Sequence, residues 1–341
     1  MTFASSFTLA HRRVGADAPI LFIAEAGVAH FGDASKADAL VDLAANAGAD
    51  VFKTQAFSTD ELVSARLPEW RRRLRPKEVG LPFLARMKER CDHRGLTFMC
   101  TAHDETALGW VDELDVPAFK IGSGERGNTP FLRKIASRGK PIILSTGMYR
   151  RDDIEQALTT MAESGCRELA LLHCVTSYPV PDPQVNLRAM DALRSLFPGP
   201  VGYSDHTQGH DAVLAAAARG AHIVEKNIAL DFDIPDAQDW KVSAGPDDLA
   251  VLVRSVRRIE AMLGKETIGV QDCEQPALGW ALKSLVAARD LPAGVVLAAD
   301  MVVAKRPGGG LAPHEISSVL GRRLKVSVSA DQAIARDYLA E

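Results

Sequence analysis

The chain has 341 residues, of which 47% are hydrophobic and 25% are charged, and its formal net charge at pH 7 is −4. This balance is typical of a globular protein and lacks the basic excess of a nucleic-acid binder. Residues 1–19 lack the apolar stretch of a secretory signal, and no run approaches the ~20 apolar residues that span a bilayer. The five cysteines form no C-x-x-C pair, so neither a disulfide framework nor a zinc knuckle is predicted. We expect a cytoplasmic protein that binds neither nucleic acid nor membrane.

Short apolar runs rich in Val, Ile and Leu alternate with longer amphipathic segments along residues 20–263. Strands that are buried on both faces and followed by a helix give this pattern. The predicted strands are 20–25, 51–55, 96–101, 118–123, 141–146, 169–174, 201–204 and 222–227. The predicted helices include 34–47, 77–94, 104–114, 129–138, 151–164, 209–219 and 246–263. This order of strands and helices predicts an α/β fold, a (β/α)₈ TIM barrel.

The pattern changes after the last predicted helix. Periodicity fails over 264–280, and short strands and turns then follow around Pro292-Ala293-Gly294 and Gly308-Gly309-Gly310. We expect a barrel domain over 1–270, a linker over 271–282 and a small C-terminal domain over 283–341.

Polar side chains gather at the predicted C-terminal ends of the strands, which is where TIM barrels carry their functional groups. Lys53 and Lys120 lie in apolar runs, where an unpaired ammonium would lose several kcal/mol of hydration, so each needs an anion. With the hydroxyls of Thr101, Ser123 and Ser204 they predict a cradle for phosphate or phosphoenolpyruvate. The alternative is that each lysine pairs with a neighbouring barrel carboxylate for structure alone.

Three further residues at strand ends have two interpretations each. Glu25 ends an apolar strand, so its carboxylate is a candidate general acid or base, or else a partner for one of the lysines. His206 follows Ser and Asp where the chain leaves a strand, which favours a ligand over a structural histidine. His173 lies inside an apolar strand and is predicted to be structural, a supporting donor at most.

Several long motifs in one order resemble those of the sialic acid synthase family. They are FIAEAGVAHFGD, NAGADVFKTQAF, VPAFKIGSGERGNTPFL, GKPIILSTGM, LLHCVTSYP and GYSDHT. The segment ARDLPAGVVLAADMVVAKRPGGGLAP resembles the antifreeze-like (SAF) domain that follows the barrel in that family. The resemblance spans nearly the whole chain. It implies condensation of phosphoenolpyruvate with the open-chain aldehyde of an N-acylated amino sugar, which gives a nine-carbon 2-keto acid and phosphate.

The resemblance also implies roles for individual residues. The positions that hold phosphoenolpyruvate are matched by Lys53, Thr101, Lys120, Ser123, Thr176 and Ser204. The positions that face the sugar are matched by Gln55, Glu125, Tyr178 and Asp239. Glu25 and His206 match catalytic positions. Arg306, in AKRPGGG, matches a capping-domain arginine that enters the barrel of the partner subunit, which implies a domain-swapped homodimer.

The metal side departs from the family pattern. The resemblance implies a divalent cation, Mn²⁺ or Mg²⁺, that polarises the aldehyde and positions water. His206 and a second histidine, in EKHFTLD, would bind it, but this chain reads EKNIALD and has Asn227 at the second position. An amide oxygen ligates hard cations and is a weaker ligand than imidazole for borderline metals. The identity and affinity of the metal are therefore open.

Other departures cluster on the sugar side. The chain has Trp240 where histidine is common, CTAHD instead of STPFD places His103 near the barrel mouth, and segment 61–80 is short and Arg-rich. The expected function is a phosphoenolpyruvate-dependent synthase whose acceptor is an aldose not fixed by the sequence. One alternative is a non-catalytic sugar- or phosphoenolpyruvate-binding paralogue that has lost the metal site. Another is a different metal-dependent aldolase, which the capping domain disfavours.

Overall fold

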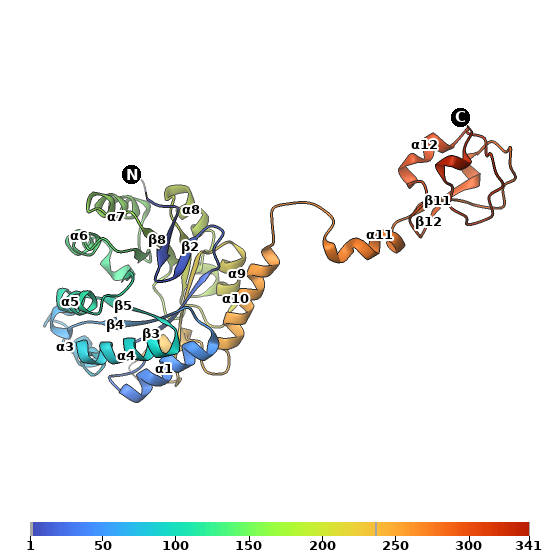
Figure 1. Ribbon diagram of the computed structural model, residues 1–341. Coiled ribbons are helices and arrows are strands. Elements are labelled where there is room, and N and C mark those ends of the chain that lie inside the picture. Colours follow the sequence, from blue (N-terminus) through green and yellow to red (C-terminus); the bar gives the residue numbers. More distant parts are fainter. Residues whose placement is uncertain (1–2, 236, 341) are drawn as a thin grey trace. The chain divides into compact units, whose positions relative to one another are not determined.

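The computed structural model describes residues 3–235 and 237–340, and the chain divides into two compact units, Met1–Gly264 and Lys265–Glu341. The first unit is a closed barrel of eight parallel strands in the order β10-β3-β4-β5-β6-β7-β8-β9 (Figure 1). These strands are β3 (Leu21–Gly27), β4 (Val51–Ala56), β5 (Thr97–Ala102), β6 (Phe119–Ile121), β7 (Ile142–Ser145), β8 (Leu169–Cys174), β9 (Val201–Asp205) and β10 (Ile223–Asn227). The predicted TIM barrel is confirmed.

Helices follow the barrel strands. They are α1 (Ala34–Ala47), α4 (Leu81–Arg94), α5 (Glu105–Glu113), α6 (Thr129–Ala136), α7 (Arg151–Glu163), α8 (Ala189–Leu196), α9 (Asp211–Ala218) and α10 (Leu249–Leu263). The prediction did not include α8, whose eight residues follow a proline-rich loop and have no side-chain N-cap. Met190 and Leu193 nevertheless bury this helix against the core.

Two apolar layers hold the barrel together. The outer layer contains strand side chains, such as Phe52, that pack against the helices. The inner layer contains strand side chains, such as Val51 and Met99, that point into the barrel. A hairpin of β1 (Ser6–Leu9) and β2 (Arg12–Gly15) adds Phe7 and Leu9 to the inner layer. Side chains alternate along a strand, so the next inward position after Val51 belongs to Lys53. The inner layer is therefore apolar toward the start of the strands and polar toward their ends.

Two loops beyond the strand ends have structure of their own. Between β4 and α4 lie α2 (Thr59–Leu62), α3 (Pro68–Leu74) and a 3₁₀ turn at Arg75–Lys77. The helix predicted to begin at residue 77 begins instead at Leu81, with Gly80 as its N-cap. Between β10 and α10 the loop contains a 3₁₀ turn at Asp239–Val242.

The second unit has its own small core. Its hairpin pairs β11 (Ser284–Ala287) with β12 (Val302–Lys305), and α12 (Ile316–Val319) packs Val319 into a cluster with Leu285, Leu297 and Leu324. The segment predicted as a linker contains α11 (Gln275–Ala281). In the described part of the chain, every helix is too short or too polar to cross a membrane.

Candidate active site

A cavity of about 500 Å³ lies at the C-terminal ends of the barrel strands. Most of the residues predicted for the site line it: Glu25, Lys53, Gln55, Thr101, Lys120, Ser123, Thr176, Tyr178, Ser204, His206, Asn227 and Asp239. Of the other two predicted sugar contacts, one does not line the cavity and one belongs to the second unit. The Glu125 carboxylate is buried, where it accepts a 2.7 Å hydrogen bond from Asn128 instead of lining the cavity. Arg306 belongs to the second unit, with its guanidinium 5.8 Å from the ring centre of Trp280.

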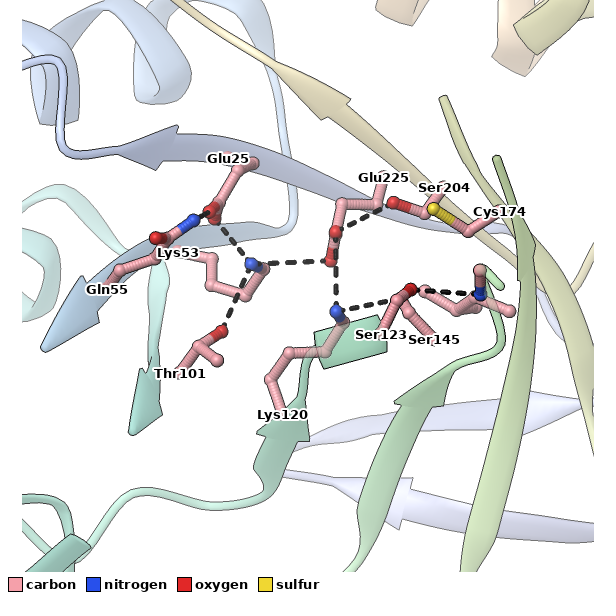
Figure 2. A network of polar contacts seen from close by, with 12 residues as sticks. Glu25, Lys53, Gln55, Thr101, Lys120, Ser123, Ser145, Cys174, Ser204 and Glu225 are labelled. Atoms are coloured by element: carbon pink, nitrogen blue, oxygen red, sulfur yellow. Dashed lines mark hydrogen bonds and ion pairs between the residues drawn. The ribbon is translucent and has the colours of Figure 1, made fainter. Parts of the chain in front are cut away.

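A buried chain of alternating charges forms the floor of the cavity (Figure 2). The Lys53 ammonium lies 2.6 Å from Glu25 and 3.6 Å from Glu225, and the Lys120 ammonium lies 3.5 Å from Glu225. Each of the four residues is at most 5% exposed, so these ion pairs are little screened by water. The carboxylate partners that the sequence left as an alternative are therefore present at both lysines. This finding is compatible with anion binding, because a ligand can displace a carboxylate.

Burial and neighbouring charges shift the four pKa values differently. Burial raises the pKa of Glu25, and this effect exceeds the lowering by Lys53. Burial also tends to raise the pKa of Glu225, but the positive charges of Lys120 and Lys53 outweigh this effect and lower the pKa. Burial lowers the pKa of Lys120 against the attraction of Glu225, whereas two carboxylates outweigh burial at Lys53 and raise its pKa. Glu225 therefore stays ionised, and Glu25 is the carboxyl group better placed to exchange a proton.

Hydroxyl groups surround the Lys120 end of this floor (Figure 2). The Lys120 ammonium donates to Ser145 at 2.9 Å, and the Ser204 hydroxyl donates to Glu225 at 2.9 Å. The Ser123 hydroxyl accepts a 2.9 Å hydrogen bond from the backbone N–H of Gly147. A Cβ at Gly147 would lie 2.7 Å from the Ser123 hydroxyl, so only glycine fits there without a shift. Cations, hydroxyls and a backbone N–H meet here, which is the chemistry that binds a phosphate or carboxylate.

Another group of polar side chains meets around Gly27. The Gln55 amide donates to Glu25 at 2.9 Å. A Cβ at Gly27 would lie 3.2 Å from a carboxylate oxygen of Asp239 and 3.6 Å from the Gln55 nitrogen. Burial raises the pKa of Asp239. The backbone at Gly27 has φ +53°, a conformation that glycine adopts without strain. The loop residue Asp239 is thus brought beside Glu25, where a neutral polar ligand such as a sugar would find donors and acceptors.

His206 presents one ring nitrogen in the form that a metal ion needs. Its Nδ1 donates to the Val175 carbonyl at 2.8 Å, because a carbonyl oxygen can only accept. Nε2 therefore carries the lone pair, which accepts a hydrogen bond from the Tyr178 hydroxyl at 3.0 Å. Burial lowers the pKa of His206, so the ring stays neutral. His173 differs, since its Nε2 lies 2.8 Å from the Val185 carbonyl and it does not line the cavity.

Asn227 is the second candidate ligand on the cavity wall. Within residues 3–235 and 237–340, no three His, Cys, Asp or Glu side chains are grouped as a metal site. His206 and Asn227 can offer one imidazole nitrogen and one amide oxygen, and water or substrate must supply the rest of the shell. Two protein ligands are too few to hold an ion permanently. They fit a hard divalent cation that binds together with the substrate.

Sequence reasoning missed Glu225 and Ser145 as site residues. Glu225 links both lysines, and its position could have been found from the alternation of β10, where it is the inward residue between Ile223 and Asn227. Ser145 ends β7 and accepts from Lys120, a position that the strand-end rule also covers.

An eight-stranded barrel whose cavity combines buried lysines, carboxylates and hydroxyls places the chain among TIM-barrel proteins with a polar cavity suited to an anion. The model of the NeuB family matches residues 40–268, and that of the SAF domain matches residues 283–339. The chain belongs to the NeuB family of sialic and nonulosonic acid synthases and carries a C-terminal SAF domain. The family resemblance seen in the sequence is confirmed.

Relatives of this chain match along nearly their whole length. N,N'-diacetyllegionaminic acid synthase from Campylobacter jejuni is 35% identical over 92% of this chain and 98% of its own. N-acetylneuraminate-9-phosphate synthase from Homo sapiens is 32% identical over 96% of this chain and 95% of its own. The crystal structure of N-acetylneuraminic acid synthetase from Leptospira borgpetersenii in complex with citrate shares 34% identity and superposes with a TM-score of 0.76, covering 81% of this chain and 96% of that one.

Proposed function

We propose that the protein condenses phosphoenolpyruvate with the open-chain aldehyde of an N-acylated amino sugar, giving a nonulosonic 2-keto acid and phosphate. The observation that carries this proposal is the buried pair Lys53 and Lys120. Glu225 lies between the two ammoniums, Glu25 contacts Lys53, and the hydroxyl of Ser145 accepts from Lys120. An anion with two charged groups is the ligand that matches two ammoniums. Relatives that are named synthases of such acids support the assignment of the reaction.

Phosphoenolpyruvate binds, in this proposal, across Lys53 and Lys120, with Thr101, Ser123, Thr176 and Ser204 as further contacts. Its negative charge would compete with Glu25 for the Lys53 ammonium, because these two groups are already in contact at 2.6 Å. An anion beside Glu25 raises the pKa of this carboxyl group further. Donor binding therefore favours a protonated Glu25.

Glu25 then serves as the general acid and later as the general base. The enol carbon C3 attacks the aldehyde carbon to form the new C–C bond, and the aldehyde oxygen takes the Glu25 proton. Water adds to C2 and gives its proton to the Glu25 carboxylate. The C2–O bond to phosphate breaks, the new hydroxyl becomes the ketone oxygen, and its proton leaves on the departing phosphate as inorganic phosphate. Glu225 stays ionised throughout and keeps both ammoniums charged.

Members of the family use a divalent cation, and His206 with Asn227 would hold it in this chain. Such an ion, Mn²⁺ or Mg²⁺, polarises the aldehyde when bound. The Val175 carbonyl orients the His206 ring, and the neutral state of that ring keeps its lone pair available.

The acceptor end is proposed to consist of Gln55, Tyr178 and Asp239, with Arg306 from a partner subunit. Glu125 does not line the cavity, and its carboxylate would hold Asn128 in place instead of binding the sugar.

The proposed domain-swapped homodimer is supported by residues 265–282, because Ile268, Trp280 and Leu282 are large apolar side chains that their own unit leaves exposed. The domain boundaries proposed from the sequence are 1–270 and 283–341.

The test is phosphate release from phosphoenolpyruvate across a panel of N-acylated aldoses, with and without Mn²⁺. The proposal predicts release that requires an aldose and grows with Mn²⁺. Binding of both substrates without any release under all conditions would instead favour the non-catalytic paralogue, for which Asn227 in place of histidine is the specific argument.

A further inference from the structure

His103 is a cavity-wall side chain that the proposed reaction does not use. It follows β5, and its backbone N–H donates to the Ala56 carbonyl at 3.1 Å, which continues the pairing of β5 with β4. Because inward positions alternate, His103 is the next inward residue after Thr101. A Cβ at Gly122 would lie 3.6 Å from Cε1 of His103, so the absence of a side chain at Gly122 leaves room beside the ring.

The ring nitrogens of His103 differ from those of two other barrel histidines. Within residues 3–235 and 237–340, neither ring nitrogen of His103 takes part in a hydrogen bond, and its aromatic neighbour is Phe57, with the ring centres 6.5 Å apart. Other histidines on the barrel behave differently, since His173 and His206 each bond a backbone carbonyl at 2.8 Å. Partly buried polar groups without a protein partner usually meet water or a ligand. The open side of His103 faces the cavity.

The charges near His103 indicate which kind of ligand it meets. Burial, followed by Lys53 and Lys120, lowers the pKa of His103 to about 4, so the ring is neutral near pH 7. A neutral imidazole carries one N–H donor and one acceptor. A Cβ at Gly122 would lie 3.6 Å from the His103 ring and also 4.0 Å from the methyl carbon of Thr101, and Gly122 directly precedes Ser123. Thr101 and Ser123 belong to the proposed anion cradle, so His103 lies beside the donor-substrate end of the cavity. An anion bound there is attracted to the N–H of the ring.

We propose that His103 donates a hydrogen bond to a phosphate or carboxylate oxygen of phosphoenolpyruvate and thereby adds to the binding of the donor substrate. This contact rests on the proposed function. It gives a binding role to His103, which lies outside the cradle of lysines and hydroxyls, on the cavity wall beside Gly122. The sequence grouped His103 with the departures on the sugar side, whereas in this proposal it determines affinity for the donor.

The test compares His103→Phe, which keeps a ring and removes both nitrogens, with His103→Gln, which restores an N–H donor. Calorimetry with phosphoenolpyruvate alone should show a dissociation constant raised by about tenfold or more in His103→Phe, as expected for a lost hydrogen bond to a charged group. His103→Gln should recover most of this loss. The KM for the aldose should change by less than about twofold in both variants, a split that a general loss of structure would not give.

Several results would overturn the inference. They are an unchanged dissociation constant for phosphoenolpyruvate in His103→Phe, a failure of His103→Gln to recover binding, or a rise in the KM for the aldose alone. Should His103→Phe fail to fold in a thermal unfolding assay, His103→Leu replaces it in the same comparison. Wild-type protein that does not bind phosphoenolpyruvate would refute the proposed function itself, whereas wild-type binding with an unaffected His103→Phe refutes this contact alone.

Discussion

The two ends of the cavity are built from different kinds of structure. At the proposed donor end, Lys53 and Lys120 project from barrel strands and contact neighbours on four other strands. At the proposed acceptor end, Asp239 comes from the loop between β10 and α10, and two further residues of the cavity wall, Trp240 and Trp70, also lie outside the strands. A strand of a closed barrel cannot shift without breaking hydrogen bonds to both neighbouring strands. Loops tolerate changes in sequence and conformation more easily. The family chemistry can therefore be kept at one end while the acceptor changes at the other.

Glu25 joins the two ends, since it touches Lys53 on one side and Gln55 on the other. We expect Glu25→Gln to lower kcat by roughly 10²–10⁴-fold, the usual contribution of a general acid or base. Affinity for phosphoenolpyruvate should stay equal or increase, because the competing charge at Lys53 is removed. Steady-state kinetics and calorimetry measure the two effects separately. A large loss of donor affinity with kcat unchanged would show that Glu25 belongs to the donor end only.

Lys120 tests the donor end by itself. Lys120→Ala removes one ammonium and leaves Glu225 with Lys53, so the dissociation constant for phosphoenolpyruvate should rise by at least about tenfold. Calorimetry is the measurement. Lys134→Ala is a matched control, because Lys134 pairs with the exposed Glu105 on the outside of the barrel. Equal affinity in Lys120→Ala and wild type would rule out the lysine cradle.

Arg306 tests the acceptor end and the partner subunit together. Arg306→Ala should raise the KM for the aldose by about tenfold and change that for phosphoenolpyruvate much less, since the loss is one charged hydrogen-bonding group at the sugar. Light scattering should give the mass of a dimer at micromolar concentration. A strictly monomeric protein with full activity would contradict the exchange of capping domains.

Asn227 gives the smallest expected effect. We expect Mg²⁺ or Mn²⁺ to support turnover and Zn²⁺ to fail, because one imidazole and an amide oxygen favour hard ions. Asn227→His should tighten metal binding on the order of a few fold by adding a second imidazole. Titration of Mn²⁺ against activity and binding checks both points. Full activity after exhaustive chelation, with unchanged metal affinity in Asn227→His, would mean that this chain works without a metal.

The place of the two buried lysines at the cavity could be predicted from the sequence because two simple rules govern it. A lysine inside an apolar run must meet an anion, and strand ends of a barrel face one cavity, which together found Lys53, Lys120 and Ser204. Glu225 could have been predicted as well, because it lies two residues before Asn227 and therefore on the same face of its strand. Loop contacts were harder. The position of Asp239 depends on how residues 228–238 fold, and no periodicity marks that path.

The central claim is tested most directly by the fate of the oxygen that joins C2 to phosphorus in phosphoenolpyruvate. This oxygen would be labelled with ¹⁸O, the reaction run with an accepted aldose, and both products examined by mass spectrometry. Our account breaks the C–O bond, so the label must appear in inorganic phosphate, and phosphate must form only when aldose is present. Label retained in the organic acid, or phosphate released equally without aldose, would contradict the account.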